Sequence, residues 1–249
     1  MSVAIIAGTA IYDIPGTSLK EEIIETPYGR ALVYRVQGDF EDFIFLARHG
    51  IKHNTPPHKV NYRANIKALE ILGVKRVLAA NAVGSINKDI PPLGLALVTD
   101  FLDFTSNREN TFFDGGESGV KHVDMSITYC PMLRKRLLAL APNFDIALYP
   151  KAIYVSANGP RLESPAEIRM YAQLGGDVVG MTGIPEATLA RELGLCYAAV
   201  AFSVNWAAGI KETIRFVADS ARFDQIKANI LALFIETLKT TSDADCYDS

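Results

Sequence analysis

Short apolar runs rich in β-branched residues recur along the chain, and several of them do not alternate between apolar and polar side chains. A strand with one face in water alternates, whereas a strand covered on both faces is apolar throughout. The runs are "SVAIIAG" (2–8), "FIFLARHG" (43–50), "RVLAANAVG" (76–84), "LALVTDFLDF" (95–104), "AIYVSANGP" (152–160), "DVVGMTG" (177–183) and "CYAAVAFSVN" (196–205). They predict a largely parallel or mixed central sheet flanked by helices.

Helical patterns with clear end signals lie between these runs. In "SPAEIRMYAQLGG", Ser164 is expected as the N-cap, Pro165 at the first helical position and Glu167 as the partner in a capping box, with Gly175 and Gly176 as the stop. The same scheme predicts a helix from Pro185 to Gly194.

A long C-terminal helix is expected from about residue 220 to 240. No linker, repeat or low-complexity tract divides the chain, so the sequence predicts one α/β domain over residues 1–241 and a frayed tail over 242–249.

Composition favours a small-molecule partner. With 25 basic and 28 acidic residues the net charge is −3, which gives no electrostatic reason to expect nucleic acid or a membrane surface. No apolar run approaches the roughly 18 residues of a spanning helix, and the N-terminus reads as a first strand, not a signal peptide. The three cysteines, Cys130, Cys196 and Cys246, are odd in number and far apart. They predict a reducing, cytoplasmic setting without disulfides, with Cys196 as core filler.

Polar or small residues end most of the apolar runs, where ligands bind in α/β sheets. They are Gly8-Thr9, Arg48-His49, Asn81-Ala82, Asn158 to Glu163, Met181-Thr182 and Asn205. Each alone has a structural interpretation, such as a turn residue, an ion-pair partner or an Asx turn. Together they offer backbone N–H groups, a guanidinium, an imidazole and two hydroxyls, which are the groups that bind a phosphate oxyanion.

Other site types find little support. "AGTA" lacks the further glycines of a dinucleotide fingerprint, and the chain contains neither a Walker A loop nor a G-x-S-x-G elbow. His49, His53 and His58 lie close together, but Gly50 and the Pro56-Pro57 pair oppose the continuous helix that a zinc site of this spacing needs. No metal site is predicted.

Seven motifs in this order resemble the trimeric purine nucleoside phosphorylase and methylthioadenosine phosphorylase family. They are "IIAGTA", "LARHG", "KVNYRANIKAL", "NAVGS", "NGPRLESPAE", "VVGMTGIPEATLARELGL" and the strand that carries Asn205. The resemblance implies an α/β fold with a mixed sheet, a homotrimer, no metal or organic cofactor, and reversible phosphorolysis of the N-glycosidic bond of a purine nucleoside, with inorganic phosphate as co-substrate.

The resemblance also implies roles for individual residues. By position, the phosphate-binding set is Thr9, Arg48, His49, the Ala82 backbone and Thr182, and the substrate-binding set is Met181, Leu162, Glu163, Asn205, His122 and Val217. Met181 lies under the ribose in the family, and His122 resembles a histidine that a neighbouring subunit lends to the 5′ pocket. Two departures stand out: Ala10 replaces a glycine, and Leu162 replaces a phenylalanine that stacks on the base.

The pair Glu163 and Asn205 favours a 6-oxopurine. A 6-oxopurine presents an N1–H donor and an O6 acceptor, which a carboxylate and an amide can bind, whereas an aspartate in place of Asn205 favours a 6-aminopurine. Glu163 and Asn205 also hold the leaving base while N7 accepts a proton or a strong hydrogen bond, so both are predicted as catalytic residues.

The 5′ substituent separates the remaining alternatives. In "KETIRFVADSARFDQI" no histidine is available for a 5′-hydroxyl, whereas Ile214, Phe216 and Val217 could enclose a methylthio group. The expected reaction is S-methyl-5′-thioinosine plus phosphate to hypoxanthine plus 5-methylthioribose 1-phosphate. The alternatives are a general 6-oxopurine nucleoside phosphorylase, a methylthioadenosine phosphorylase, and a non-catalytic nucleotide- or metal-binding protein.

Overall fold

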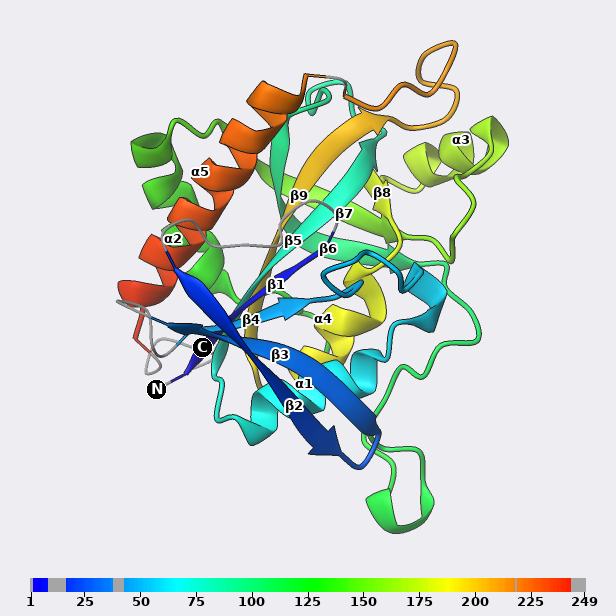
Figure 1. Cartoon of the computed structure of the whole chain (residues 1–249). Helices are drawn as coiled ribbons and strands as arrows, with labels where there is room; N and C mark the ends of the chain where they lie inside the picture. Colours follow the sequence, from blue (N-terminus) through cyan, green and yellow to red (C-terminus); the bar gives the residue numbers. More distant parts are fainter. Residues whose placement is uncertain (1, 9–16, 38–42, 218, 243–249) are drawn as a thin grey trace.

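The computed structural model describes residues 2–8, 17–37, 43–217 and 219–242 (Figure 1). Its strands are β1 (Val3–Ala7), β2 (Ser18–Thr26), β3 (Gly29–Gln37), β4 (Phe43–Ala47), β5 (Arg76–Ser85), β6 (Leu95–Asp103), β7 (Leu148–Ser156), β8 (Val178–Gly180) and β9 (Cys196–Trp206). Its α-helices are α1 (Tyr62–Ile71), α2 (Pro131–Leu140), α3 (Pro165–Gln173), α4 (Gly183–Glu192) and α5 (Ser220–Lys239). Three short 3₁₀ helices are η1 (Pro57–Lys59), η2 (Gly116–Ser118) and η3 (Ala141–Phe144).

The described strands form one mixed sheet in the order β2-β3-β4-β1-β5-β8-β7-β6-β9, and β9 also pairs with β5. The sheet therefore closes on itself through β5, β8, β7, β6 and β9. Strands β4, β1, β5 and β9 run parallel to one another, whereas β8 is antiparallel to β5 and β6 is antiparallel to β9. The expected mixed sheet flanked by helices is confirmed.

Burial on both faces explains the apolar runs. Along β1, Ala4 and Ile6 pack into one core cluster, which α1 and α4 cover, and Val3, Ile5 and Ala7 pack into another, which α2 and α5 cover. Figure 1 shows α2 and α5 on one side of the sheet and α1 and α4 on the other. A third, smaller cluster lies under α3 and includes Val155 and Val179.

The predicted helix signals agree with the structure. Ser164 caps α3 by accepting from the Glu167 N–H, and the Glu167 side chain accepts from the Ser164 N–H in return, which completes the capping box. Thr182 precedes α4, but Ile184 has an extended backbone, so regular helix begins at Pro185 as the sequence predicted.

Among the described strands and α-helices, four were not predicted: β2, β3, α1 and α2. The hairpin of β2 and β3 lies at the edge of the sheet, and its burial is mixed, so it gives no unbroken apolar run. Helix α1 begins after Asn61, whose side chain accepts from the Ala64 N–H. Helix α2 begins at Pro131 after Cys130, which gives no side-chain cap.

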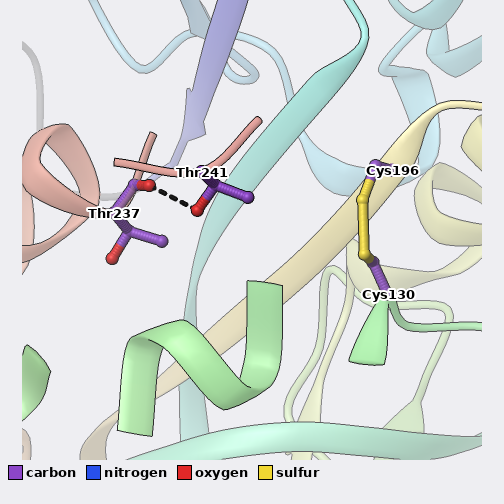
Figure 2. The surroundings of a disulfide bond; sticks show 4 residues. All are labelled: Cys130, Cys196, Thr237 and Thr241. Atoms are coloured by element: carbon purple, nitrogen blue, oxygen red, sulfur yellow. Dashed lines mark hydrogen bonds between the residues drawn. A yellow bond between two sulfur atoms is a disulfide. The ribbon is translucent and has the colours of Figure 1, made fainter. Parts of the chain in front are cut away.

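The prediction of a chain without disulfides was wrong, although Cys196 is buried in the core as expected. Cys130 and Cys196 form a disulfide with a Cα–Cα distance of 5.4 Å, which joins the start of α2 to the start of β9 (Figure 2). Both side chains are fully buried in the cluster under α2 and α5. Sequence separation misled the prediction, since the fold brings together two positions that are 66 residues apart in the sequence. Cys246 lies outside the described residues.

The C-terminal helix ends at Lys239, close to the predicted position. Figure 2 shows the turn that follows it, where the Thr241 hydroxyl donates to the Thr237 carbonyl over 2.7 Å. Residues 243–249 of the predicted tail lie outside the described part of the chain. Within the described part, none of the helices is long and apolar enough to cross a membrane.

Candidate active site

One cavity of about 290 Å³ contains most of the predicted site residues. Gly8, Arg48, His49, Ala82 and Thr182 line one part of it, and further residues come from later elements. These are Leu162, Glu163, Met181, Asn205, Ile214, Phe216 and Val217. Residues from seven separate segments thus meet at one end of the sheet.

Parallel pairing explains part of this convergence. Strands β1, β4, β5 and β9 run in the same direction, so Gly8, Arg48 and Asn205 meet at their carboxyl ends. Thr182 reaches the cavity by another route, because β8 runs antiparallel to β5 with Val179 opposite Gly84. That register carries the chain after β8 back alongside the middle of β5.

Arg48 is held by a buried carboxylate that sequence reasoning missed. The Nε and Nη2 atoms of Arg48 each donate to Glu186 over 2.7 Å, and Nη1 donates to the Ala80 carbonyl over 3.1 Å. Tyr197 also donates to Glu186, over 2.8 Å. Burial disfavours the charged guanidinium, but the ion pair with Glu186 outweighs burial and raises the pKa of Arg48.

The geometry leaves one edge of the Arg48 guanidinium directed at the cavity. A Cβ atom added to Gly8 would lie 2.9 Å from Nη1, so only a glycine lets the backbone approach this closely. Because Glu186 already neutralises the guanidinium, Arg48 offers the cavity an oriented N–H and no uncompensated positive charge.

His49 is neutral and presents a lone pair. Its Nδ1 lies 2.8 Å from the Thr55 carbonyl, which can only accept, so Nδ1 carries a hydrogen and, in the neutral ring, Nε2 carries none. Burial, followed by the charge of Arg48, lowers the pKa of His49 to about 4. A Cβ on Gly8 would lie 3.5 Å from Nε2, which places that nitrogen at the same end of the cavity as Arg48.

The Thr182 turn is fixed by two buried polar groups. The Tyr154 hydroxyl accepts from the backbone N–H groups of Thr182 and Gly183, each over 3.2 Å. The Asn81 amide donates to the Thr182 hydroxyl over 3.2 Å. The side chain of Thr182 is therefore held in place at the cavity wall.

A β-bulge directs Asn205 into the cavity. In the pairing of β5 with β9, Val83 lies opposite Ser203 and Gly84 lies opposite Asn205, so Val204 is an extra residue. The Asn205 amide donates to the Trp206 carbonyl over 2.7 Å and passes over Gly84, where a Cβ would lie 3.3 Å from Nδ2. The amide oxygen and the second N–H remain for a ligand.

Glu163 lies just before α3 and is partly buried at the cavity wall. Burial raises the pKa of its carboxyl above the ordinary value, and the charge of Glu167 adds to this effect. Its neighbour Leu162 also lines the cavity, although its side chain is 41% exposed.

The remaining wall is apolar and is attached to the bulge. Ile214, Phe216 and Val217 line it, and the Val217 N–H donates to the Val204 carbonyl over 3.0 Å. The segment after β9 is therefore anchored next to Asn205. None of the described residues that line the cavity is a histidine apart from His49.

Two predicted residues are not placed at the cavity. Thr9 lies outside the described residues. His122 is exposed and does not line the cavity. It belongs to the long excursion after β6, which covers residues 104–130 between β6 and α2. The part of this excursion around η2 projects from the opposite end of the molecule to α3 (Figure 1).

The described residues contain no group of three or more histidine, cysteine or acidic side chains that could hold a metal ion. The rings of His49 and His53 lie 4.8 Å apart. His58 lies further along the chain, in η1.

Comparison with known proteins identifies the family. The model of the phosphorylase superfamily matches residues 2–239. The chain is 52% identical to a probable 6-oxopurine nucleoside phosphorylase of Moorella thermoacetica, over 86% of this chain and 82% of the relative. It is 44% identical to a probable S-methyl-5′-thioinosine phosphorylase of Methanocaldococcus jannaschii, over 97% of this chain and 90% of the relative.

Solved structures agree. A mutant adenosine/methylthioadenosine phosphorylase from Schistosoma mansoni, in complex with adenine, superimposes with a TM-score of 0.87 at 29% identity, over 96% of this chain and 91% of that chain. The chain belongs to the phosphorylase superfamily, as its motifs indicated.

Proposed function

We propose that this protein catalyses phosphorolysis of 6-oxopurine nucleosides, with S-methyl-5′-thioinosine as the preferred substrate. The observation that carries the proposal is the shared cavity: Glu163 and Asn205 lie in the same space as Arg48, His49 and Thr182. A purine-binding pair and an oxyanion-binding set thus adjoin each other. The names of the relatives include both 6-oxopurine and S-methyl-5′-thioinosine phosphorylases.

At the phosphate end, Arg48 and Thr182 donate hydrogen bonds to phosphate oxygens. His49 accepts, because its Nε2 carries a lone pair, so it binds an oxygen of the phosphate that bears a hydrogen. Ala82 contributes its backbone at the same end, and Thr9 is proposed to complete the set. The phosphate lies under C1′, where it stabilises the positive charge that develops on the sugar and then forms the new C–O bond.

At the base end, the Glu163 carboxylate accepts from N1–H of a 6-oxopurine, and the Asn205 amide binds O6 or N7. As the glycosidic bond breaks, its electron pair moves to the purine, and a hydrogen bond or proton at N7 stabilises the leaving base. Met181 contacts the ribose between the two ends, and Leu162 covers the base. A 6-aminopurine reverses the donor and acceptor pattern and leaves buried groups unpaired.

The apolar wall of Ile214, Phe216 and Val217 carries the 5′ preference. Burying a methylthio group contributes on the order of 1–2 kcal/mol, and a buried unpaired hydroxyl costs a similar amount, so both effects favour the thioether. A general 6-oxopurine nucleoside phosphorylase is the second candidate, because relatives of 50–52% identity bear that name.

We further propose a homotrimer in the cytoplasm. His122 is exposed and away from the cavity of its own chain, so it contacts a nucleoside only if a neighbouring subunit brings it there. The cysteines were expected to be free of disulfides, as in a reducing compartment. Because Cys130 and Cys196 form a disulfide, cysteine usage no longer supports the cytoplasmic location. Light scattering after gel filtration should give three times the mass of the chain, and a monomer mass would contradict the assignment of His122.

The reaction takes phosphate as co-substrate and needs no cofactor, so activity should be unchanged by EDTA. A panel of four nucleosides, each with and without phosphate, tests the function: S-methyl-5′-thioinosine, inosine, methylthioadenosine and adenosine. Hypoxanthine should appear only with phosphate, and kcat/KM for S-methyl-5′-thioinosine should exceed that for inosine by about 10²-fold. Base release from the 6-aminopurine nucleosides alone would indicate a methylthioadenosine phosphorylase. If none of the four nucleosides released its base, the chain would be a non-catalytic binding protein.

A further inference from the structure

Arg108 lies in the excursion after β6, where sequence reasoning assigned it no role. Its guanidinium donates to four backbone carbonyls. Nη1 donates to Met181 over 2.7 Å and to Ile184 over 2.9 Å, and Nη2 donates to Asn158 over 2.9 Å and to Ala157 over 3.4 Å. These carbonyls belong to two different loops, one after β7 and one after β8.

The environment of Arg108 is not that of a surface ion pair. In the described part of the chain its partners are neutral oxygens, and the guanidinium lies over the ring of Tyr62, 5.5 Å from the centroid. The Tyr62 hydroxyl donates to the carbonyl of Pro57, which itself lines the cavity. The planar fork of an arginine, with donors on both sides, suits this set of divergent acceptors, and the ammonium of a lysine does not.

Both loops carry residues of the cavity. Met181 and Thr182 lie in the loop after β8, and the loop after β7 leads through Gly159 to Glu163. The two loops also touch directly, because a Cβ added to Gly159 would lie 2.4 Å from the Met181 sulfur. The contact of Met181 with Gly159 and the hydrogen bonds of Arg108 therefore fix the separation of the loops.

We infer that Arg108 is a positioning residue that sets the base-reading end of the cavity at a defined distance from the phosphate end. The inference rests on the proposed function, because only a reaction between two bound partners depends on that distance. Reacting atoms need to lie within about 3–3.5 Å of each other, and a misplacement of 1 Å costs on the order of 10²-fold in rate. Each ligand alone, in contrast, contacts only one end of the cavity, so its Kd depends little on the distance between the two ends.

Arg63 provides a matched control. It anchors the same excursion through ion pairs with Glu109 and Asp114 and a hydrogen bond to the Thr111 carbonyl. It has no contact with the loops after β7 and β8 among its described interactions. The variant Arg63→Met thus loosens the excursion without freeing the two loops.

The test compares Arg108→Met, Arg108→Lys and Arg63→Met with the wild type. Steady-state kinetics with S-methyl-5′-thioinosine and phosphate give kcat and both KM values, and calorimetry gives the Kd of hypoxanthine alone and of phosphate alone. Arg108→Met should lower kcat by about 10²-fold while each Kd changes by less than about threefold. Arg108→Lys should lie between, and Arg63→Met should keep kcat within about threefold of wild type.

The inference is overturned if Arg108→Met and Arg63→Met have equal kcat, or if the loss lies wholly in the Kd of the single ligands. Where Arg108→Met does not fold, Arg108→Lys decides by the same two criteria. Wild-type protein that releases no base in the presence of phosphate would instead remove the proposed function, and with it the basis of the inference.

Discussion

The buried pair of Arg48 and Glu186 allows a quantitative prediction. Their side chains are only 1% and 2% exposed, and two hydrogen bonds of 2.7 Å join them. Replacing Glu186 by leucine leaves a buried guanidinium without its counter-charge, which costs about 3–5 kcal/mol of unfolding free energy. Replacing Arg48 by methionine leaves the carboxylate unpaired and costs a similar amount. Replacing both leaves no uncompensated charge, so the double variant should lose less than either single one.

Urea denaturation of the four proteins at one protein concentration gives this double-mutant cycle. The expected coupling free energy is about 3 kcal/mol or more, because each single change includes the cost of the partner left behind. Costs that add within about 0.5 kcal/mol would mean that the two side chains do not depend on each other, contrary to their geometry. In addition, Glu186→Gln should raise the KM for phosphate more than that for nucleoside, because the Arg48 guanidinium is then no longer held in place by the ion pair with Glu186.

Three further predictions concern the base, the pH profile and the disulfide. Asn205→Asp should lower kcat/KM for S-methyl-5′-thioinosine by at least about 10²-fold and raise it for methylthioadenosine, and full retention of 6-oxopurine activity would refute the role of Asn205. Burial raises the pKa of Glu163, so kcat/KM should fall with decreasing pH already above the ordinary glutamate range; Glu163→Gln should lose this acid limb, and an unchanged limb would assign it to another group. Cys130→Ala should lower the free energy of unfolding by up to about 4 kcal/mol without reductant, from closure of a loop of 66 residues. Equal stability of variant and wild type would show that the disulfide does not form in solution.

Periodicity and end signals were sufficient for much of the fold. Strands β1, β4 and β9 are buried on both faces, and this burial is what an unbroken apolar run records. The capping box at Ser164 is equally local, so it could be predicted from neighbouring residues. The hairpin of β2 and β3 escaped prediction because its side chains divide between core and solvent at the sheet edge. The pairing of β9 with both β5 and β6 depends on contacts distant in sequence.

The same difference between local signals and contacts distant in sequence applies to the site. Residues that end strands, such as Arg48 and Asn205, could be identified one strand at a time, and the motifs identified the family. Glu186 could not, because a glutamate in the first turn of a helix ordinarily faces solvent. Its burial becomes visible only when α4 packs beside Arg48 and Tyr197. Arg108 was missed for a related reason, since its partners are backbone carbonyls, which carry no sequence signal.

The direct test of the central claim is the fate of the phosphate. Phosphorus NMR of the protein with S-methyl-5′-thioinosine and inorganic phosphate follows whether phosphate is joined to the sugar as the base is released. A phosphorylase should form one sugar phosphate ester for each hypoxanthine, with no hypoxanthine when phosphate is omitted. Release of hypoxanthine without a new phosphate ester signal would show hydrolysis by water, and would contradict the assignment of Arg48, His49 and Thr182 as the site of the attacking phosphate.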